Sequence, residues 1–251
     1  MTRIYKIGKQ IDRYKNECKA LLDVAQYSIL EDYLTNREYA GISETQLYKD
    51  IRSLRNLVCF RKKEFGTYTS DDIKSFMLDL KRKGKRSRKI YWYSLKKFFE
   101  YLDKSELFVD KPRFRKKTKL PEELLTLEDV RGIVEACTNL RDKAFFTALY
   151  ETGARIGELL PLKIKHVSFD QKGGILILNG KTGMRRVRII QSVPLLAQWV
   201  GIHPHRLDSG AYLFPPKAAQ GVMSYSAMRR RLTKAVQKAG IQKRVHFHLF
   251  R

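Results

Sequence analysis

Four side chains in the second half of the sequence are of the types needed to hold a phosphodiester while it is broken. They are Arg155, Lys181, His248 and Arg251, and each lies in a short polar motif. Guanidinium groups are permanently charged and can bond two oxygens at once, which suits the extra negative charge of a phosphoryl transition state. A lysine or histidine can exchange a proton with an attacking or departing oxygen. These residue types therefore predict chemistry on phosphate groups.

The composition indicates a polyanionic partner. Lys and Arg number 51 against 26 Asp and Glu, which gives the 251 residues a formal net charge of +25. Such an excess favours nucleic acid as the partner, although a protein with many solvated lysines has the same composition. Hydrophobic residues make up 43% of the chain, enough to bury a sizeable core.

Several other kinds of protein and site are not supported. The sequence has no apolar run long enough to span a membrane and no apolar signal core at its start, so we expect a cytoplasmic protein. Cys18, Cys59 and Cys137 are far apart, and we expect them to be buried small apolar residues. His203 and His205 lie in a proline-bearing loop without a third ligand, so no metal is expected.

The first half of the sequence predicts helices that flank a basic loop. One helical stripe covers residues 1 to about 40, and Ser43-Glu-Thr-Gln46 predicts a capping box for a second helix. A third helix is expected to begin at Thr69, and a fourth carries Trp92. Between these two, seven of nine residues are basic; phosphates along a duplex would neutralise them, unless they form a solvated loop or a nuclear-type address. These candidate DNA-binding residues are Lys81, Arg82, Lys83, Lys85, Arg86, Arg88 and Lys89.

A second basic block predicts a linker over residues 111–119, between a domain of residues 1–110 and a domain of residues 120–251. Proline, charge and the absence of hydrophobic periodicity mark it as a linker. A basic linker that joins two basic domains suggests a clamp that closes around DNA. Its candidate DNA-binding residues are Arg113, Arg115, Lys116 and Lys117.

The second half contains the elements that must position the four candidate residues. Thr126 is expected to cap one helix, and an almost wholly apolar helix from about Arg141 to Tyr150 is expected to be the buried centre. A short helix carries Arg155. Period-two patterns then predict three antiparallel strands, at about 164–169, 175–178 and 185–190, with Lys181 in the second turn. Helices follow at about 193–200 and 225–239, so the fold class is mainly α with a small antiparallel β-sheet (α+β).

These motifs resemble those of the tyrosine recombinase (phage integrase, Xer-like) family. The resemblance rests on Thr152-Gly-Ala-Arg-Ile-Gly-Glu-Leu-Leu-Pro-Leu162, Gly180-Lys-Thr-Gly183 and His248-Leu-Phe-Arg251, in matching order over about residues 120–251. The Lys-Thr-Gly turn and the His-Leu-Phe-Arg motif look most like the archaeal branch. The first 110 residues are similar to the helical core-binding domain that the family places ahead of its catalytic domain.

The resemblance implies metal-independent, cofactor-free cleavage and rejoining of double-stranded DNA, as in site-specific recombination or integration. In this family a tyrosine attacks DNA to give a 3′-phosphotyrosyl link. Arg155 and Arg251 match the two catalytic arginines, and Lys181 matches the hairpin lysine that protonates the departing 5′-oxygen. His248 would assist proton transfer or bond a phosphate oxygen, and Glu158 would orient Arg155.

Simpler interpretations exist for several of these residues. Glu158 also fits an ordinary i,i+3 surface pair with the catalytic arginine candidate. Lys172 is the nearest competitor of Lys181 but lacks the Gly-Lys-Thr-Gly setting. His246 competes with His248, and the His-x-x-Arg spacing selects His248.

No tyrosine follows Arg251, although the family's nucleophile lies beyond the His-x-x-Arg motif. We therefore expect a chain cut short before the nucleophile, with a natural inactive remnant as the alternative. Such a chain would bind DNA without cleaving it and would be a monomer in solution, whereas the complete enzyme would be tetrameric on DNA. The rival functions are a catalytically inert DNA-binding regulator and a type IB topoisomerase-like enzyme.

Overall fold

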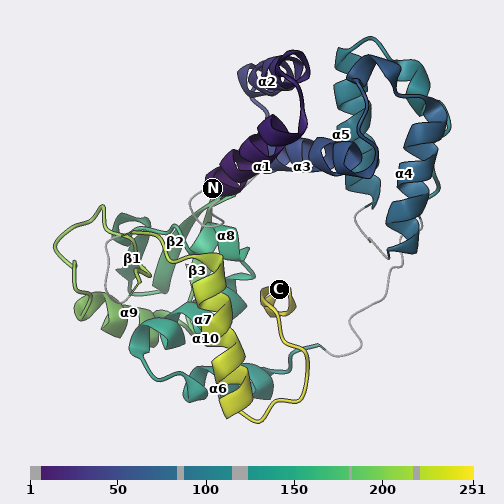
Figure 1. Cartoon of the computed structure of the whole chain (residues 1–251). Coiled ribbons are helices and arrows are strands. Elements are labelled where there is room, and N and C mark those ends of the chain that lie inside the picture. Colours follow the sequence, from purple (N-terminus) through teal and green to yellow (C-terminus); the bar gives the residue numbers. More distant parts are fainter. Residues whose placement is uncertain (1–6, 84–87, 115–123, 181–182, 217–220) are drawn as a thin grey trace. The chain divides into compact units, whose positions relative to one another are not determined.

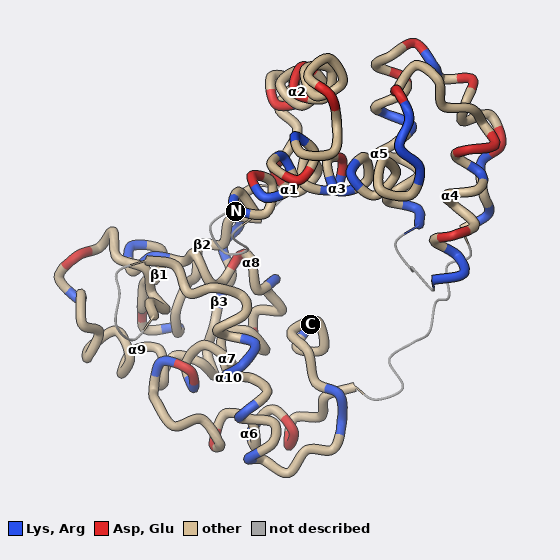
Figure 2. Tube along the Cα trace, viewed as in Figure 1, with Lys and Arg blue, Asp and Glu red and all other residues tan. Residues whose placement is uncertain are grey.

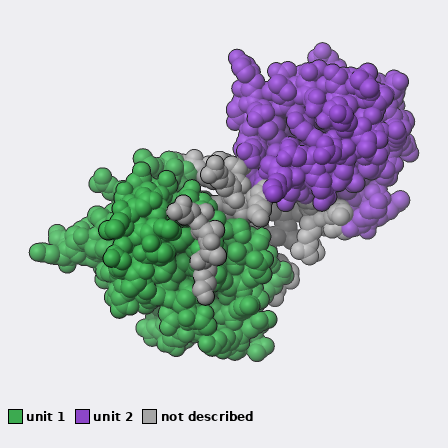
Figure 3. Space-filling model, turned by 60° about the vertical axis from the view of Figure 1, so that its left-hand side comes forward, with its two compact units in different colours: residues 1, 3–5, 119–251 green, residues 2, 6–118 purple. Residues whose placement is uncertain are grey.

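The computed structural model describes residues 7–83, 88–114, 124–180, 183–216 and 221–251 (Figure 1). The chain divides into two compact units, Lys6–Thr118 and Lys119–Arg251, which Figure 3 colours separately. The first is a helical unit, and the second, here called the C-terminal unit, combines helices with a three-stranded antiparallel sheet. The predicted fold class, mainly α with a small antiparallel sheet, is confirmed.

The helical unit is built around a core of aliphatic and aromatic side chains. Phe98, which is fully buried, packs edge to face against Tyr33 and Phe65, with ring centroids 5.1 and 4.7 Å apart. Such aromatic pairs add to the hydrophobic stabilisation of the core. The elements of the unit are α1 (Ile7–Leu21), α2 (Val24–Tyr39), α3 (Glu44–Phe60), η2 (Phe65–Thr67), α4 (Ser70–Arg82), α5 (Arg88–Tyr101) and η3 (Ser105–Phe108).

Two predictions for this unit are wrong in detail. The single helix expected over residues 1 to about 40 is interrupted at Asp23, whose carboxylate accepts the backbone N–H of Gln26 at 2.8 Å and so begins α2. Ser43 does precede α3, but its side chain makes no capping hydrogen bond. The amide of Gln46 is directed instead to the buried carboxylate of Asp50, at 2.8 Å.

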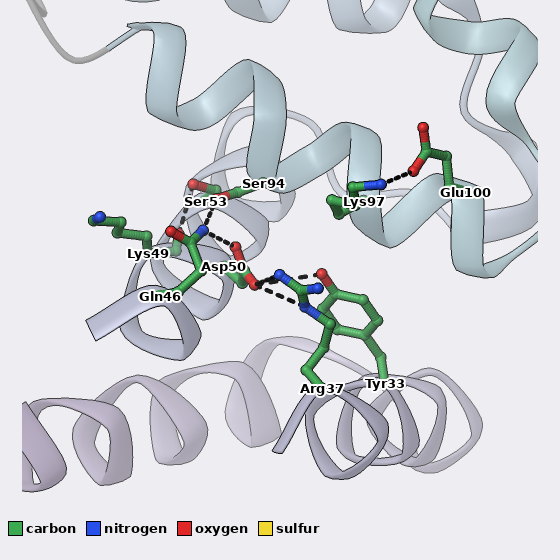
Figure 4. Close-up of polar contacts among 9 residues, drawn as sticks. All are labelled: Tyr33, Arg37, Gln46, Lys49, Asp50, Ser53, Ser94, Lys97 and Glu100. Carbon is green, nitrogen blue, oxygen red and sulfur yellow. Dashed lines mark hydrogen bonds and ion pairs between the residues drawn. The ribbon is translucent and has the colours of Figure 1, made fainter. Parts of the chain in front are cut away.

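That carboxylate is the centre of a buried polar network (Figure 4). Asp50 is fully buried and, besides the Gln46 amide, accepts hydrogen bonds from Nη2 of Arg37 at 3.3 Å and from the hydroxyl of Tyr33 at 3.5 Å. Because a buried charge is costly without donors, these bonds favour attachment of α2, which carries Tyr33 and Arg37, to α3.

The cysteines differ from one another. Cys18 and Cys137 are buried as expected, but Cys59 is exposed, so the expectation that all three are buried is wrong. On α3 the buried positions include Leu54, Leu57 and Val58, and the following residue, Cys59, faces solvent. No helix in the described ranges is long and apolar enough to cross a lipid bilayer.

The C-terminal unit is organised around α7, as expected for its apolar sequence. Ala144, Phe145, Ala148 and Leu149 of this helix are fully buried. The sheet has the order β1-β2-β3, with both pairs antiparallel. The elements are α6 (Leu127–Ala136), α7 (Leu140–Thr152), α8 (Ile156–Leu159), η4 (Ile164–His166), β1 (Val167–Asp170), β2 (Gly173–Gly180), β3 (Gly183–Ile189), α9 (Val193–Gly201), α10 (Tyr225–Lys238) and η5 (Phe247–Phe250).

The first strand is shorter than predicted because residues 164–166 form the 3-10 turn η4. The N–H of Ile164 donates to the carbonyl of Ala211 at 3.0 Å instead of to a neighbouring strand. The Nδ1 atom of His166 accepts the N–H of Lys163 at 3.2 Å, which closes the turn. The contact of Ile164 with Ala211 joins residues 47 positions apart in the sequence (211 − 164), so local periodicity could not reveal it.

Candidate active site

Arg155 lies at the junction of α7 and α8, where the backbone changes direction. Helix α7 ends at Gly153, which has φ +55° and ψ +24°, a left-handed conformation that glycine adopts readily. Arg155 then has extended backbone angles and precedes α8. Its backbone N–H donates to Oε2 of Glu158 at 3.0 Å, and its Nη1 donates to Oε1 at 3.1 Å. The acid therefore fixes both the main chain and the side chain of Arg155.

Glu158 also binds a second arginine. Nη2 of Arg185, on β3, donates to Oε2 of Glu158 at 2.7 Å. Burial by itself would raise the pKa of Glu158, which is 3% exposed, but the hydrogen bonds from Arg185 and Arg155 lower it to about 2. The carboxylate is therefore ionised across the physiological range, and it links α8 to the β2–β3 hairpin.

Gly180, at the end of β2, leaves room for this carboxylate. A Cβ atom at this position would lie 2.5 Å from Oε1 of Glu158 and 3.3 Å from Nη1 of Arg185. Any other residue would require the acid or the arginine to move. The glycine of the Gly-Lys-Thr-Gly motif is thus explained by close packing against the Arg155–Glu158–Arg185 cluster.

Glu151 fixes the end of α7 from another direction. Its carboxylate accepts the backbone N–H groups of Ile190, Gln191 and Ser192 and the Ser192 hydroxyl, at 2.6–2.9 Å. Burial would raise the pKa of Glu151, but these hydrogen bonds hold it below its ordinary value. Because Ser192 immediately precedes α9, this contact holds the Gly153 turn against the start of that helix.

The last residues of the chain are anchored by two phenylalanines of η5. Phe250 stacks on Phe146 of α7 with ring centroids 6.0 Å apart, and Phe247 packs edge to face against Tyr225 of α10 at 5.4 Å. His248, on the same turn, is exposed. The two buried rings set the orientation of η5 and leave its histidine accessible.

Arg251 lies against the turn that precedes Arg155. A Cβ atom placed on Gly153 would be 3.7 Å from Cγ of Arg251, an ordinary van der Waals separation. The aliphatic part of the Arg251 side chain therefore lies beside Gly153, which precedes Arg155 by two positions. The two arginines themselves are nearly 100 residues apart in the sequence. The exposed side chain of Arg251 is free to turn its guanidinium toward a ligand.

The predicted lysine cannot be placed in the same way. Lys181 lies outside the described residues, between Gly180 and Gly183, which pair with each other at the ends of β2 and β3. Its competitor Lys172 is exposed in the β1–β2 turn, where its N–H donates to Oδ1 of Asp170.

Arg185 was not among the predicted site residues, although strand alternation contains a signal for it. Arg185, Val187 and Ile189 share one face of β3, opposite the buried Leu178 and Leu176 and near Gly174 of β2. A charged residue on a face that otherwise packs against the core needs a buried partner. Glu158 is that partner.

Basic residues are spread over the helical unit, and several of them lie at the end of α4 and the beginning of α5 (Figure 2). Lys83 is partly neutralised, since its Nζ lies 2.9 Å from Oδ2 of Asp79. Lys89 and Lys111 place their Nζ atoms 5.8 and 5.3 Å from the ring centroid of the exposed Tyr93. Four further candidates are described: Lys81 and Arg82 at the end of α4, Arg88 at the start of α5, and Arg113. The other candidates lie outside the described residues: Lys85, Arg86, Arg115, Lys116 and Lys117.

The histidine pair in the loop after α9 is used internally. Nε2 of His203 bonds the carbonyl of Tyr212 at 3.1 Å, and its Nδ1 accepts the N–H of His205 at 3.0 Å. Burial lowers the pKa of His203. Within the described ranges, no group of three potential metal-ligating side chains comes together.

Comparison with known proteins gives a consistent family assignment. Residues 123–251 match the model of the phage integrase family. The chain is 31% identical over 202 residues to tyrosine recombinase XerA of Pyrococcus horikoshii, covering 78% of this chain and 67% of the relative. It is 30% identical over 227 residues to XerA of Pyrococcus furiosus, covering 87% and 76%.

Solved structures share the fold at lower identity. A lambda integrase dimer bound to a COC′ core site has a TM-score of 0.69 at 17% identity, over 89% of this chain and 67% of that one. The XerH recombinase bound to palindromic difH substrate has a TM-score of 0.66 at 15% identity, over 96% and 81%. From the family model and the Pyrococcus relatives together, the chain belongs to the phage integrase family of tyrosine recombinases.

Proposed function

We propose that this chain acts on DNA as part of a site-specific recombinase and that its arginine pair binds the scissile phosphate. The observation that best supports this is the convergence of Arg155 and Arg251 at the Gly153 turn, with Arg155 fixed by a buried, ionised Glu158. Two arginines that approach the same turn can direct both guanidinium groups to the non-bridging oxygens of one phosphodiester. Because the contacts strengthen as negative charge builds up, they lower the barrier as well as adding affinity.

In this proposal each remaining residue has a separate role. Lys181 protonates the departing 5′-oxygen, and His248 exchanges a proton with the nucleophile or bonds a phosphate oxygen. Glu158 orients Arg155 and, through Arg185, ties the hairpin that carries Lys181 to the same site. The exposed position of His248 on an anchored turn is compatible with this role.

DNA is the partner that the charge favours. The net charge of +25 and the basic residues that end α4 and begin α5 suit a duplex backbone. Among the proteins of similar fold, lambda integrase was solved on a core site and on a Holliday junction, and XerH on its difH substrate. By analogy, we propose that the complete catalytic assembly contains several subunits on DNA, with a tetramer as the expected form.

For the 251-residue chain by itself we propose DNA binding without cleavage. None of its thirteen tyrosines follows the His-x-x-Arg motif, where the family's nucleophile lies. We expect the isolated chain to be a monomer and to form no covalent adduct with a nicked suicide duplex, a substrate that traps phosphotyrosyl intermediates. An adduct that withstands denaturing electrophoresis would contradict this and would require a nucleophile among the tyrosines present.

The phosphate contacts can be tested by binding alone. Duplexes that the chain prefers are first selected from a randomised pool, and one phosphate at a time is then neutralised as a methylphosphonate. Arg155→Ala should weaken binding by about 10- to 150-fold, as expected for a charge-assisted contact, and should reduce the slope of log affinity against log salt by about one. The methylphosphonate position that lowers the affinity of the wild-type chain most should not lower the affinity of the Arg155→Ala variant any further.

A matched control removes another exposed arginine of the same unit that, like Arg155, is paired with an acid. Arg188 pairs with Asp170 at 2.7 Å on the exposed face of the sheet, so Arg188→Ala should leave the methylphosphonate profile unchanged. If Arg155→Ala also leaves it unchanged, the phosphate site has been misassigned. If the wild-type chain binds no duplex above background at low salt, the proposed function itself is wrong.

A further inference from the structure

One half-buried arginine of the helical unit has a side-chain donor without an acceptor among the described residues. Arg52, on α3, is half-buried, and its Cζ lies 5.4 Å from the ring centroid of Tyr48 and 5.3 Å from that of Tyr91 on α5. The hydroxyl of Tyr91 accepts the amide of Asn56 at 2.9 Å, which fixes one of the two rings. Arg52 is therefore confined between aromatic rings of two helices.

Its Nε atom is buried and has no hydrogen-bond partner. A nearby acid is already used, since Glu17 pairs with Arg13 at 3.0 Å and with Arg55 at 2.8 Å. Most buried and half-buried arginines among the described residues have a carboxylate partner. The exceptions are Arg52 and Arg88, and Arg88 borders residues that are not described. Those paired arginines are Arg37, Arg55, Arg141 and Arg231.

An unpaired guanidinium in a partly desolvated position is costly unless a ligand supplies the acceptors. The surrounding charges do not supply them, because Lys49 and Arg55 on the same helix are also basic and the rings of Tyr48 and Tyr91 offer only their faces. The two rings flank the guanidinium, so little side-chain freedom would be lost on binding. A ligand with two acceptors would satisfy donors that the protein leaves open.

We infer that Arg52 reads a guanine of the target DNA by bonding its O6 and N7 atoms in the major groove. A guanine edge presents two acceptors in one plane, which matches the planar fork of donors of an arginine. Phosphates of the backbone can be met by mobile, exposed side chains, and the ends of α4 and α5 supply these in Lys81 and Lys89. The inference rests on the proposed function, because it requires the chain to bind DNA.

The test compares base preferences of the wild type and of two variants, each selected on the same randomised duplex pool. Arg52→Met keeps the length of the side chain but removes the charge and the fork, and Arg52→Lys keeps the charge and removes only the fork. We expect Arg52→Met to lose preference at a single base pair, by about 5- to 150-fold, with the rest of the site unchanged. Arg52→Lys should lose part of the same preference. Lys81→Gln, a control that removes one exposed charge, should weaken all sequences equally.

A second measurement identifies the acceptor atom. Replacing that guanine by 7-deazaguanine removes N7 and preserves base pairing, so it should weaken the wild-type complex but not the Arg52→Met complex. If Arg52→Met does not fold, as judged by circular dichroism, the same comparison is made with Arg52→Lys, whose loss on the modified duplex should be smaller than that of the wild type.

Three results would overturn the inference. Equal losses for the wild type and the variant on 7-deazaguanine would show that Arg52 does not contact N7. A uniform loss over all sequences would indicate a phosphate contact, and an unchanged preference matrix would indicate a structural residue. In each of these cases the wild type still selects a site, so the proposed function survives; a wild type that selects no duplex defeats both.

Discussion

Two buried carboxylates of the C-terminal unit each hold two arginines, yet they differ in how much of the arginines remains accessible. Asp142 binds Arg141 and Arg231, whose side chains are 7% and 31% exposed. Glu158 binds Arg155 and Arg185, whose side chains are 54% and 40% exposed. The first cluster is closed to solvent on most sides, and the second turns much of its guanidinium surface outward.

The Asp142 cluster is closed because its donors are used within the protein. Arg141 also donates to the carbonyl of Pro215 at 2.6 Å, and the amide of Asn139 donates to Asp142 at 2.8 Å. The cluster therefore joins the start of α7, the Pro215 loop and Arg231 of α10. An acid with two arginines therefore does not by itself indicate a binding site, and the exposed guanidinium surface is the feature that favours the Glu158 cluster as the proposed one.

The largest effect should follow from opening the closed cluster. Asp142→Ala leaves Arg141 buried without its carboxylate, so we expect the free energy of unfolding to fall by about 3–5 kcal/mol. Urea denaturation followed by circular dichroism measures this loss. A matched control is Asp170→Ala, which removes an exposed acid paired with Arg188 and should cost about 1 kcal/mol or less. Equal losses for the two variants would show that burial of the arginine is not what distinguishes them.

A smaller and pH-dependent effect is expected at the open cluster. The pKa of Glu158 is lowered from 4.5 to about 2, so its carboxylate contributes stability that is fully present above about pH 4.5 and is lost as the pH falls through 2. The size of the shift corresponds to about 3 kcal/mol. Glu158→Gln should therefore be less stable than the wild type by that amount at pH 7, and the two proteins should converge between pH 4.5 and 2.

Urea denaturation of both proteins at several pH values isolates this contribution, because every other titrating group is common to the pair. A stability difference that stays constant down to pH 2 would show that the hydrogen bonds to Glu158 do not depend on its charge.

Features that form between near neighbours in the sequence were predictable, and features that depend on tertiary contacts were not. The capping boxes of Thr69 with Asp72 and of Thr126 with Asp129 form within four residues, so local pattern sufficed to locate the start of α4 and of α6. Gln46 was assigned to a cap but bonds Asp50, because a buried carboxylate competes successfully for its amide.

The candidate site was predictable only in part, because some of its residues depend on contacts between distant parts of the chain. Arg155, His248 and Arg251 were identified by motif and by family resemblance, which carry information from other sequences. Arg185 and Arg52 have no motif, and their importance depends on a buried acid 27 residues away and on an aromatic ring of another helix. Partners of this kind are fixed by tertiary packing, which periodicity and capping rules do not describe.

The smallest expected effect tests whether Gly180 is a glycine because of Glu158. Gly180→Ala should cost about 1–2 kcal/mol, since its Cβ would displace the Glu158 carboxylate from Arg155. Combined with Glu158→Ala, which empties that space, the same substitution should cost nothing further, a coupling of about 1–2 kcal/mol in a double-mutant cycle. Gly157→Ala is the control: a Cβ there meets nothing within 4 Å, so its cost should be independent of Glu158. Strict additivity of Gly180→Ala and Glu158→Ala would mean that the glycine serves the hairpin turn alone, and that the Glu158 carboxylate does not constrain the end of β2.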